Sequence, residues 1–360
     1  MHIKKVQLEN FRNCESITLD FLNQKILIVG KNAQGKTNIL ESIYLLSSLR
    51  SPRTSTFSDM INFSAKSFEI SAEIIKNDTL LEMQLTYNNE KKRELKLNHL
   101  KTNASNFKNV LKTVLFSTKD LLLLRGTPQD RRDWLDRAIS QIYPAYDERI
   151  SVYEKFRMQK NNLLKSEVID ETLLDIYNEQ IIITGANIIM VRKKFLNELE
   201  KIATIKHKAI SDTEEFQLKY TAKGETIEEI SNALKEEIQE RRAEEVARKQ
   251  SCVGPHRDDV QFLIDDIDAI KFASQGQQRT LVLSLKLAEL DLIKERCGLS
   301  PILLLDDVLA ELDDLRQNYL LKSIDADIQT IITSVDTLLF DEDFLNTVQI
   351  FTVSNGKIIF

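Results

Sequence analysis

Two short segments near opposite ends of the chain carry the residue types of a nucleotide triphosphate site. The first, Gly30 to Thr37, reads G-K-N-A-Q-G-K-T and has the spacing of a phosphate-binding loop. An apolar run, Ile26 to Val29, precedes it, and apolar residues at helical spacing (Ile39, Leu40, Ile43) follow it. Because this strand–loop–helix context is the one in which the motif works, the segment predicts a loop that holds nucleotide phosphates.

Each residue type in the loop suits this chemistry. Gly30 and Gly35 let backbone N–H groups approach the phosphates, and the following helix presents its positive end to them. We expect Lys36 to reach the β- and γ-phosphates as a catalytic cation, and the Thr37 hydroxyl to bind Mg²⁺. The predicted contacts of ATP in this segment are Gly30, Lys31, Asn32, Ala33, Gln34, Gly35, Lys36, Thr37 and Asn38.

The second segment is an apolar run, Ile302 to Leu305, that ends in two carboxylates. Asp306 is predicted to bind Mg²⁺, directly or through water, and Asp307 to orient or deprotonate the attacking water. A helix N-cap or an exposed acidic turn is the alternative interpretation. Asp306 lies 270 residues after Lys36, so one site must be assembled from both ends of the chain, with a large insertion between them.

A third segment, Ser274 to Arg279, reads S-Q-G-Q-Q-R and directly precedes an amphipathic helix. Ser274 suits an N-cap, and Gly276 allows close backbone approach to an anion at the helix N-terminus. One subunit already has a complete phosphate loop, so we expect this segment to close the nucleotide of a second subunit in a homodimer. Ser274 is assigned a catalytic role across that interface, and Ser274, Gly276 and Gln277 are predicted nucleotide contacts. An ordinary capped helix is the alternative.

The arrangement of expected elements predicts an α/β protein. Residues 1–125 are β-rich with one early helix, residues 126–250 are dominated by helical periodicity, and strands alternate with helices again in residues 251–360. Thr226 and Glu229 form a capping-box pattern that opens a helix to about Lys249. The predicted strands are 6–11, 17–21, 68–74, 81–87, 93–97, 26–29, 302–305, 330–333, 348–353 and 358–360, with a turn at 76–78.

Composition limits the class of protein. The chain has 360 residues, 42% of them apolar, which suffices for a sizeable core. No apolar run approaches the ~20 residues of a membrane helix, and the N-terminus does not read as a signal peptide. Cys14, Cys252 and Cys297 have no metal-ligand spacing, which favours a reducing cytoplasm over disulfides.

The net charge of −6 does not exclude a nucleic acid partner, because a local basic footprint governs that binding. Residues 91–112 hold seven basic side chains against one acidic, and residues 192–208 hold six against two. A solvated helix or strand face is the alternative for each run. The predicted DNA phosphate contacts are Lys91, Lys92, Arg93, Lys96, Arg192, Lys193 and Lys194.

The order of four motifs resembles the ATP-binding-cassette heads of chromosome-maintenance ATPases. These motifs are the phosphate loop, the S-Q-G-Q-Q signature, the L-L-L-D-D strand and the L-A-E-L-D loop. Within that superfamily the chain is similar to the RecF family of bacterial recombination mediators. The blocks that carry this resemblance are Leu8 to Arg12, Gly30 to Glu41, Phe116 to Leu121, Arg131 to Asp136 and Gly254 to Asp259.

The resemblance implies a cassette head (1–125 and 251–360), with a mixed sheet around the phosphate loop and an antiparallel β-lobe, interrupted by a helical lid (126–250). It also implies ATP-driven dimerisation, preference for single-strand/duplex DNA junctions, and work with RecR in placing RecA at gaps during repair, replication restart and the SOS response.

The chain departs from the wider cassette pattern at two positions. Asp307 replaces the usual catalytic Glu and is one methylene shorter, and Thr333-Ser334 stands where a switch His is usual. Both departures indicate slow hydrolysis that serves as a switch rather than a motor. We expect a structural or interdomain role for His256, between Pro255 and Arg257, rather than a catalytic one.

Three other functions are weighed. A transporter ATPase does not account for the long insert or the Gly254 to Asp259 block. A chromosome-scaffold ATPase would need hundreds of heptad residues in its insert. A nucleotide-gated DNA-binding module with negligible turnover stays open because of Asp307, and turnover measured with and without DNA would separate it from an ATPase.

Overall fold

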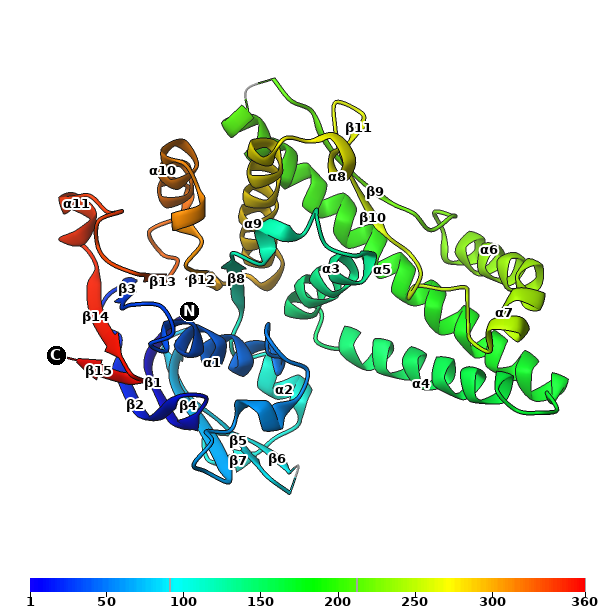
Figure 1. Cartoon of the computed structure of the whole chain (residues 1–360), viewed down its shortest axis with the longest axis horizontal. Helices are drawn as coiled ribbons and strands as arrows, with labels where there is room; N and C mark the ends of the chain where they lie inside the picture. Colours follow the sequence, from blue (N-terminus) through cyan, green and yellow to red (C-terminus); the bar gives the residue numbers. More distant parts are fainter. Residues whose placement is uncertain (91, 212, 360) are drawn as a thin grey trace. The chain divides into compact units, whose positions relative to one another are not determined.

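The computed structural model describes all residues except 91, 212 and 360, and the chain divides into two compact units. The head unit comprises residues 1–121 and 285–360, and the lid unit comprises residues 122–284. Both ends of the sequence therefore build one unit (Figure 1). The domain limits predicted from the sequence, 126 and 250, stay a prediction.

A six-stranded sheet carries the nucleotide motifs of the head unit, in the order β15-β14-β3-β13-β12-β8. All neighbouring pairs are parallel except β14 with the edge strand β15. Parallel sheets are covered on both faces, which is why β12 reads as an unbroken apolar run with every residue before Asp306 buried. The strands are β3 (Lys25–Val29), β8 (Thr113–Ser117), β12 (Ile302–Asp306), β13 (Thr330–Ser334), β14 (Gln349–Ser354) and β15 (Lys357–Ile359).

The second sheet of the head is antiparallel, in the order β2-β1-β4-β5-β6-β7. Its strands alternate buried and exposed residues, as expected where one face covers a core. Asn77 and Asp78 have positive φ angles and join β4 to β5 in a two-residue turn, the backbone that suits a tight hairpin. The strands are β1 (His2–Phe11), β2 (Cys14–Asp20), β4 (Ser67–Lys76), β5 (Thr79–Asn88), β6 (Arg93–Leu97) and β7 (Leu100–Lys101).

Helix α1 (Lys36–Ser48) contacts strands of both sheets and is buried along most of its length. Ile39, Leu40 and Ile43 join one apolar core with residues of both sheets. The phosphate loop is therefore held on a rigid frame. The other helical segments of the head are η1 (Phe57–Met60), α2 (Ala104–Lys108), η3 (Leu309–Glu311), α10 (Asp314–Ser323) and α11 (Glu342–Leu345).

The lid unit is mainly helical, with a small antiparallel sheet in the order β11-β10-β9. Helix α5 (Glu171–Ser211) contacts α3, α4, α6 and β9, so it forms the spine of the unit (Figure 1). Two segments extend across the limits of the units: η2 (Asp120–Leu122) and α9 (Gln275–Cys297). The remaining elements are α3 (Pro128–Ile142), α4 (Tyr146–Leu164), β9 (Phe216–Tyr220), α6 (Ile227–Glu240), α7 (Arg242–Arg248), β10 (Val260–Ile264), β11 (Ile267–Asp268) and α8 (Ala269–Phe272).

The predicted α/β fold class is confirmed. The strands predicted in the head are also confirmed, within a few residues at their ends. Within the described residues, the final strand ends at Ile359. The Thr226 capping box is present. The helix it opens ends at Glu240, and α7 continues after Arg241, whose φ and ψ of −94° and 8° break the expected single helix. The sequence did not predict β7, β8, β9, β10 or β11. Across the described ranges, no helix is long and apolar enough to cross a membrane.

Candidate nucleotide-binding site

The phosphate loop lies between β3 and α1, and its glycines are required by the backbone around them. A Cβ atom on Gly30 would lie 2.4 Å from the backbone oxygen of Val353 on β14. Gly35 has a φ of +116°, a conformation that side chains disfavour. Helix α1 begins immediately afterwards, so its N-terminal N–H groups face the loop. This arrangement can bind phosphate through backbone groups.

The Lys36 side chain folds back over the loop and is 3% exposed. Its ammonium donates to the backbone oxygens of Gly30 at 2.6 Å and Lys31 at 3.3 Å, and lies 3.8 Å from Asp307 Oδ2. The backbone oxygens make the shortest contacts and fix the position of the charge, and the Asp307 carboxylate lies farther away. The cation is therefore held where the loop would present phosphate to it.

Residues from both ends of the chain meet at the C-terminal ends of the parallel strands. Thr37 Oγ1 donates to Asp306 Oδ1 at 2.9 Å, and Thr333 Oγ1 donates to the same oxygen at 3.1 Å. Burial raises the pKa of Asp306, and the neighbouring Asp307 charge raises it further. The predicted pairing of Thr37 with Asp306 is thus present in the geometry.

Asp307 has an unusual environment for a carboxylate. Its backbone N–H donates to Thr333 Oγ1 at 2.9 Å, and its φ is +51°, an uncommon value for a residue other than glycine. Its Oδ1 atom is buried and has no hydrogen-bond partner among the described residues. A buried oxygen without a donor is costly, so its presence beside the phosphate loop calls for a functional explanation.

These oxygens fit the Mg²⁺ ion that accompanies ATP in such sites. Thr37 and Asp306 supply a hydroxyl and a carboxylate side by side, and Asp307 offers a further buried oxygen. Mg²⁺ usually takes one or two carboxylates together with phosphate oxygens and water. The described residues contain no group of three His, Cys, Asp or Glu side chains that could hold a metal alone. The protein donors therefore suit an ion that arrives with its nucleotide.

These motifs line a cavity of about 600 Å³ in the head unit. The loop between β8 and η2 forms part of its wall. Asp120 anchors that loop, since it accepts from the backbone N–H and hydroxyl of Ser117 at 2.8 Å each and pairs with Lys286 at 3.0 Å. The cavity is lined by Asn13, Asn32, Ala33, Gln34, Gly35, Lys36, Thr37, Asn38, Leu40, Glu41, Pro52, Arg53, Leu115, Ser117, Thr118, Lys119, Asp306 and Asp307.

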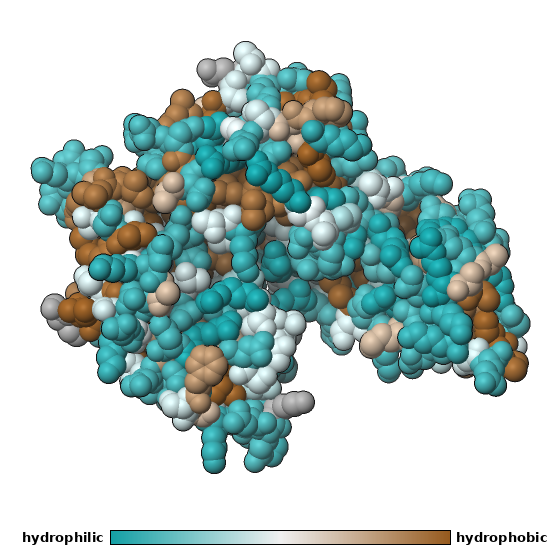
Figure 2. All heavy atoms as spheres, in the orientation of Figure 1, coloured by the Kyte–Doolittle hydropathy of each residue, from teal (hydrophilic) through white to brown (hydrophobic). Residues whose placement is uncertain are grey.

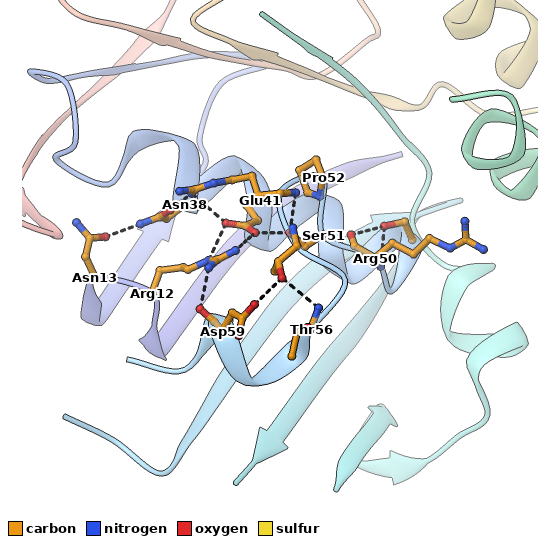
Figure 3. A network of polar contacts seen from close by, with 12 residues as sticks. Arg12, Asn13, Asn38, Glu41, Arg50, Ser51, Pro52, Thr56 and Asp59 are labelled. Carbon is orange, nitrogen blue, oxygen red and sulfur yellow. Dashed lines mark hydrogen bonds and ion pairs between the residues drawn. The ribbon is translucent and has the colours of Figure 1, made fainter. Parts of the chain in front are cut away.

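A polar network beside α1 surrounds Glu41 (Figure 3). One of its members, Arg53, also lines the cavity and is a second cation there. The buried Glu41 carboxylate accepts from Arg12 at 2.6 and 3.1 Å and from Ser51 at 2.5 Å. It also accepts from Arg53 at 3.3 Å, while Arg53 donates to Asn38 at 2.6 Å. Arg12 is thereby fixed as a structural partner, and Arg53 stays partly exposed at the cavity. Arg53 and Lys119 were not predicted from the sequence as residues of this site.

Gln34 has a structural contact that the sequence did not predict. Its side-chain oxygen accepts from the backbone N–H of Asn355 at 2.6 Å, and its backbone oxygen accepts from Gly356 at 2.8 Å. The hairpin between β14 and β15 therefore holds the loop from one side. A nucleotide contact by Gln34 stays a prediction and would use its backbone N–H.

The signature residues belong to the lid unit, at the start of α9. The backbone N–H of Ser274 donates to Gln277 Oε1 at 2.8 Å, and that of Gln277 donates to Ser274 Oγ at 3.2 Å. This reciprocal pair caps the helix, and Gly276 lies between its members. Roles of Ser274, Gly276 and Gln277 toward a nucleotide stay predictions.

Two sequence blocks of the lid bind each other. Arg131 makes a bidentate ion pair with Asp259, with both hydrogen bonds at 2.7 Å, and Arg132 donates to the backbone oxygen of Asp258 at 2.6 Å. His256 Nδ1 lies 2.5 Å from the Tyr153 hydroxyl, and burial lowers the pKa of His256 to about 3. His256 is thus a half-buried residue whose hydrogen-bond partners Tyr153 and Ser251 lie in the lid, and its structural role stays a prediction.

Two of the predicted DNA contacts are wrong. Arg192 is buried, at 4% exposure, and Lys193 is held by Gly224 and Glu225. A guanidinium inside the lid cannot reach a DNA phosphate. Arg192 follows Ile188 and precedes Phe195 and Leu199 at helical spacing, a sequence signal that it lies on the buried face. The Arg192 side chain instead donates to Asp136, Tyr146, Tyr220 and the backbone oxygen of Pro255.

The other candidates keep their surface positions where described. Lys194, Lys92 and Arg93 are exposed, and Lys96 is half-buried. Lys91 lies outside the described residues. Their contact with DNA stays a prediction.

Comparison with known proteins agrees with this geometry. The family described as RecF/RecN/SMC N terminal domain matches residues 2–359. "DNA replication and repair protein RecF" of Bacillus velezensis is 39% identical over 100% of both chains, and that of Bacillus subtilis is 38% identical over 100% of both.

Solved structures show the same relationship. The recombination mediator protein RecF-ATP of the RecFOR pathway aligns with a TM-score of 0.90 and 32% identity, covering 99% of this chain and 97% of that one. An Smc head bound to the C-terminal winged-helix domain of ScpA aligns at 16% identity with a TM-score of 0.57, covering 100% and 98%. The latter likeness shows the shared fold alone.

Proposed function

The chain belongs to the RecF family within the RecF/RecN/SMC group, and on that premise we propose that it is a DNA-binding ATPase of recombinational repair. ATP hydrolysis acts as a switch in this proposal. ATP-bound subunits pair and hold DNA at single-strand/duplex junctions, and hydrolysis releases them. With RecR, the dimer promotes RecA loading at gaps, supporting replication restart and the SOS response.

The observation that carries the proposal is the joining of Thr37 and Asp306 beside the Lys36 ammonium. Residues from both ends of the sequence thereby line one cavity, and their side chains are of the types that bind a nucleoside triphosphate and its metal ion. Lys36 would neutralise β- and γ-phosphate charge, and backbone N–H groups of the loop would orient the phosphates. Mg²⁺, held by Thr37 and Asp306, would supply further charge neutralisation when bound.

Asp307 is proposed to act on the attacking water. Its carboxylate lies at the cavity, with Oδ2 3.8 Å from Lys36 Nζ and Oδ1 buried without a donor among the described residues. A water that donates to this oxygen would be oriented and lose its proton to it. The shorter Asp side chain reaches less far than Glu, and slow turnover is expected.

Dimerisation is supported by two features of separate units. The signature residues Ser274 and Gln277 cap α9 in the lid, and every residue lining the cavity belongs to the head. The head also exposes large apolar side chains around α10 and α11, where apolar atoms gather on the face seen in Figure 2. Leu338 is 87% exposed there, which suits an association surface.

The test measures DNA binding and oligomeric state together, with ATP, ADP and no nucleotide. A gapped duplex, a blunt duplex and a single strand serve as DNA. The proposal expects dimers and the tightest gapped-duplex binding only with ATP, and ATP turnover that increases with DNA. A monomer under all three conditions would refute the switch. Tight ATP-dependent DNA binding without measurable turnover would instead establish the nucleotide-gated binding module.

A further inference from the structure

A chain of hydrogen bonds runs from the signature to the end of α5, entirely within the lid unit. The side-chain amide of Gln277 donates to Glu214 Oε1 at 2.9 Å. The other carboxylate oxygen, Glu214 Oε2, lies 3.0 Å from Nε2 of His207, which is fully buried near the C-terminal end of α5. Figure 1 shows α5 ending at the side of the unit where α9 begins.

The direction of each bond follows from the chemistry of the groups. An ionised Glu214 can only accept, so Gln277 must present its NH₂ group and His207 its Nε2–H. The Gln277 side-chain oxygen is thereby left to accept from the backbone N–H of Ser274, at 2.8 Å. Both halves of the Gln277 amide are therefore used inside the lid.

His207 makes this orientation hard to reverse. Its Nδ1 atom is buried and without a hydrogen-bond partner among the described residues, and its ring packs against Phe216, with centroids 5.6 Å apart. Burial lowers the pKa of His207, and the contact with the Glu214 carboxylate acts in the opposite direction. Moving the proton to Nδ1 would leave a buried N–H without an acceptor, which costs more than leaving a lone pair unfilled.

We propose that Glu214 is a positioning residue of the signature, which fixes the Gln277 amide and through it the Ser274 backbone by anchoring them to His207 on α5. Gln277 then acts by shaping the signature rather than by touching nucleotide with its side chain. The inference rests on the proposed function, since it supposes that the signature closes the nucleotide of a second subunit.

The bond directions provide a swap test. In Glu214→Gln, the new amide faces two donors, the NH₂ group of Gln277 and the Nε2–H group of His207. Its single oxygen can accept from only one of them, so two donors must face each other at one of the hydrogen bonds. In Gln277→Glu, two carboxylates face each other. The double variant Glu214→Gln/Gln277→Glu restores every bond: the amide oxygen at 214 accepts from His207, its NH₂ donates to the carboxylate at 277, and that carboxylate accepts from Ser274.

The experiment uses the full chain and measures ATP-dependent dimerisation by sedimentation, with monomer ATP binding and thermal unfolding as checks of folding. Glu215→Gln is the matched control, because Glu215 is the next residue, carries the same charge and has an exposed side chain. We expect each single swap to weaken dimerisation about tenfold or more. The double variant should return to within about twofold of the parent, with ATP binding by the monomer unchanged throughout.

Two results would overturn the inference. If Glu214→Gln dimerises as the Glu215→Gln control does, the bond chain is dispensable. If the double variant is no better than the single swaps, the Gln277 amide acts directly. Failure of the proposed function is distinguishable, because then Ser274→Arg would also leave ATP-dependent dimerisation intact.

Discussion

Two buried cations, Lys36 of the head and Arg192 of the lid, are held in different ways. In the head, Lys36 is held by backbone oxygens, and Asp307 keeps a buried oxygen without a donor among the described residues. In the lid, the Arg192 guanidinium is saturated by a bidentate bond to Asp136 and by neighbouring hydroxyl and backbone oxygens. A charged group at a cavity that still has unused hydrogen-bonding capacity indicates a role in binding or catalysis. A charged group whose hydrogen bonds are all made within the protein indicates a role in stability.

The largest effect should follow from changing the head cation. Lys36→Arg keeps the charge but replaces a compact ammonium with a planar fork that cannot take the same place over the loop. We expect ATP binding to be retained or modestly weaker, and hydrolysis to fall roughly 100-fold or more. Turnover and nucleotide affinity of the purified variant measure both.

Lys322→Arg on α10 is the matched control, since Lys322 is exposed in the same unit. Normal turnover by Lys36→Arg would remove Lys36 from the catalytic residues. The different environments of Lys36 and Arg192 would then not reflect a difference in function.

The corresponding change in the lid should affect stability instead. Arg192→Leu leaves the Asp136 carboxylate buried without its cation, a loss of about 3–5 kcal/mol in unfolding free energy. Hydrogen exchange of lid amides reports that loss locally, while ATP binding by the monomer should be unchanged. Lys194→Leu, an exposed neighbour on α5, should change stability by no more than about 0.5 kcal/mol. Equal losses from the two variants would contradict the structural role of Arg192.

A smaller effect concerns His256, a half-buried histidine of the lid. Because the pKa of His256 is lowered to about 3, the unfolded chain binds a proton below about pH 6.5 that the folded lid does not. Stability from this group is therefore present above pH 6.5 and lost as the pH falls, by about 2 kcal/mol between pH 8 and 5.

His256→Gln should remove this pH dependence in lid hydrogen exchange. Burial raises the pKa of Asp258 to about 6, which acts in the opposite direction, but that contribution is common to both proteins and cancels in the difference. A difference between parent and variant that is constant from pH 8 to 5 would exclude a neutral His256 in the folded lid.

The smallest expected effect concerns the exposed charges of the β-lobe. Replacing Lys92 and Lys96 by Gln should reduce the slope of log affinity for DNA against log salt by roughly one unit for each lysine that binds a phosphate. Lys322→Gln removes a charge from the same unit as a control. An unchanged slope would return Lys92 and Lys96 to the class of solvated surface residues.

Local chemistry explains which features could be predicted from the sequence. The phosphate loop, the strand before Asp306 and the Thr226 capping box are contiguous patterns whose physics acts within a few residues. The pairing of Thr37 with Asp306 also followed, since each motif implies the other. Strand β8 was missed because its buried run needs β12, far away in the chain, as its partner.

Longer-range burial explains the errors. Arg192 lies within a basic run, and its charge suggested a position on the surface. Its partners Asp136, Tyr220 and Pro255 are distant in the sequence, so its burial could not be predicted from the run itself. Arg53 and Lys119 were missed because loop residues carry no periodicity that would direct them toward the cavity. The contact between Glu214 and Gln277 spans 63 residues and involves no motif on the Glu214 side.

Ser274→Arg tests whether the lid of one subunit and the head of another together form one nucleotide site, as proposed. The bulky side chain would stand where backbone must approach the partner's γ-phosphate. Sedimentation with ATP, together with turnover, should show normal ATP binding by the monomer, no ATP-dependent dimer and little hydrolysis. A Ser274→Arg protein that dimerises with ATP and hydrolyses it at the parent rate would show that the signature does not act across a subunit interface.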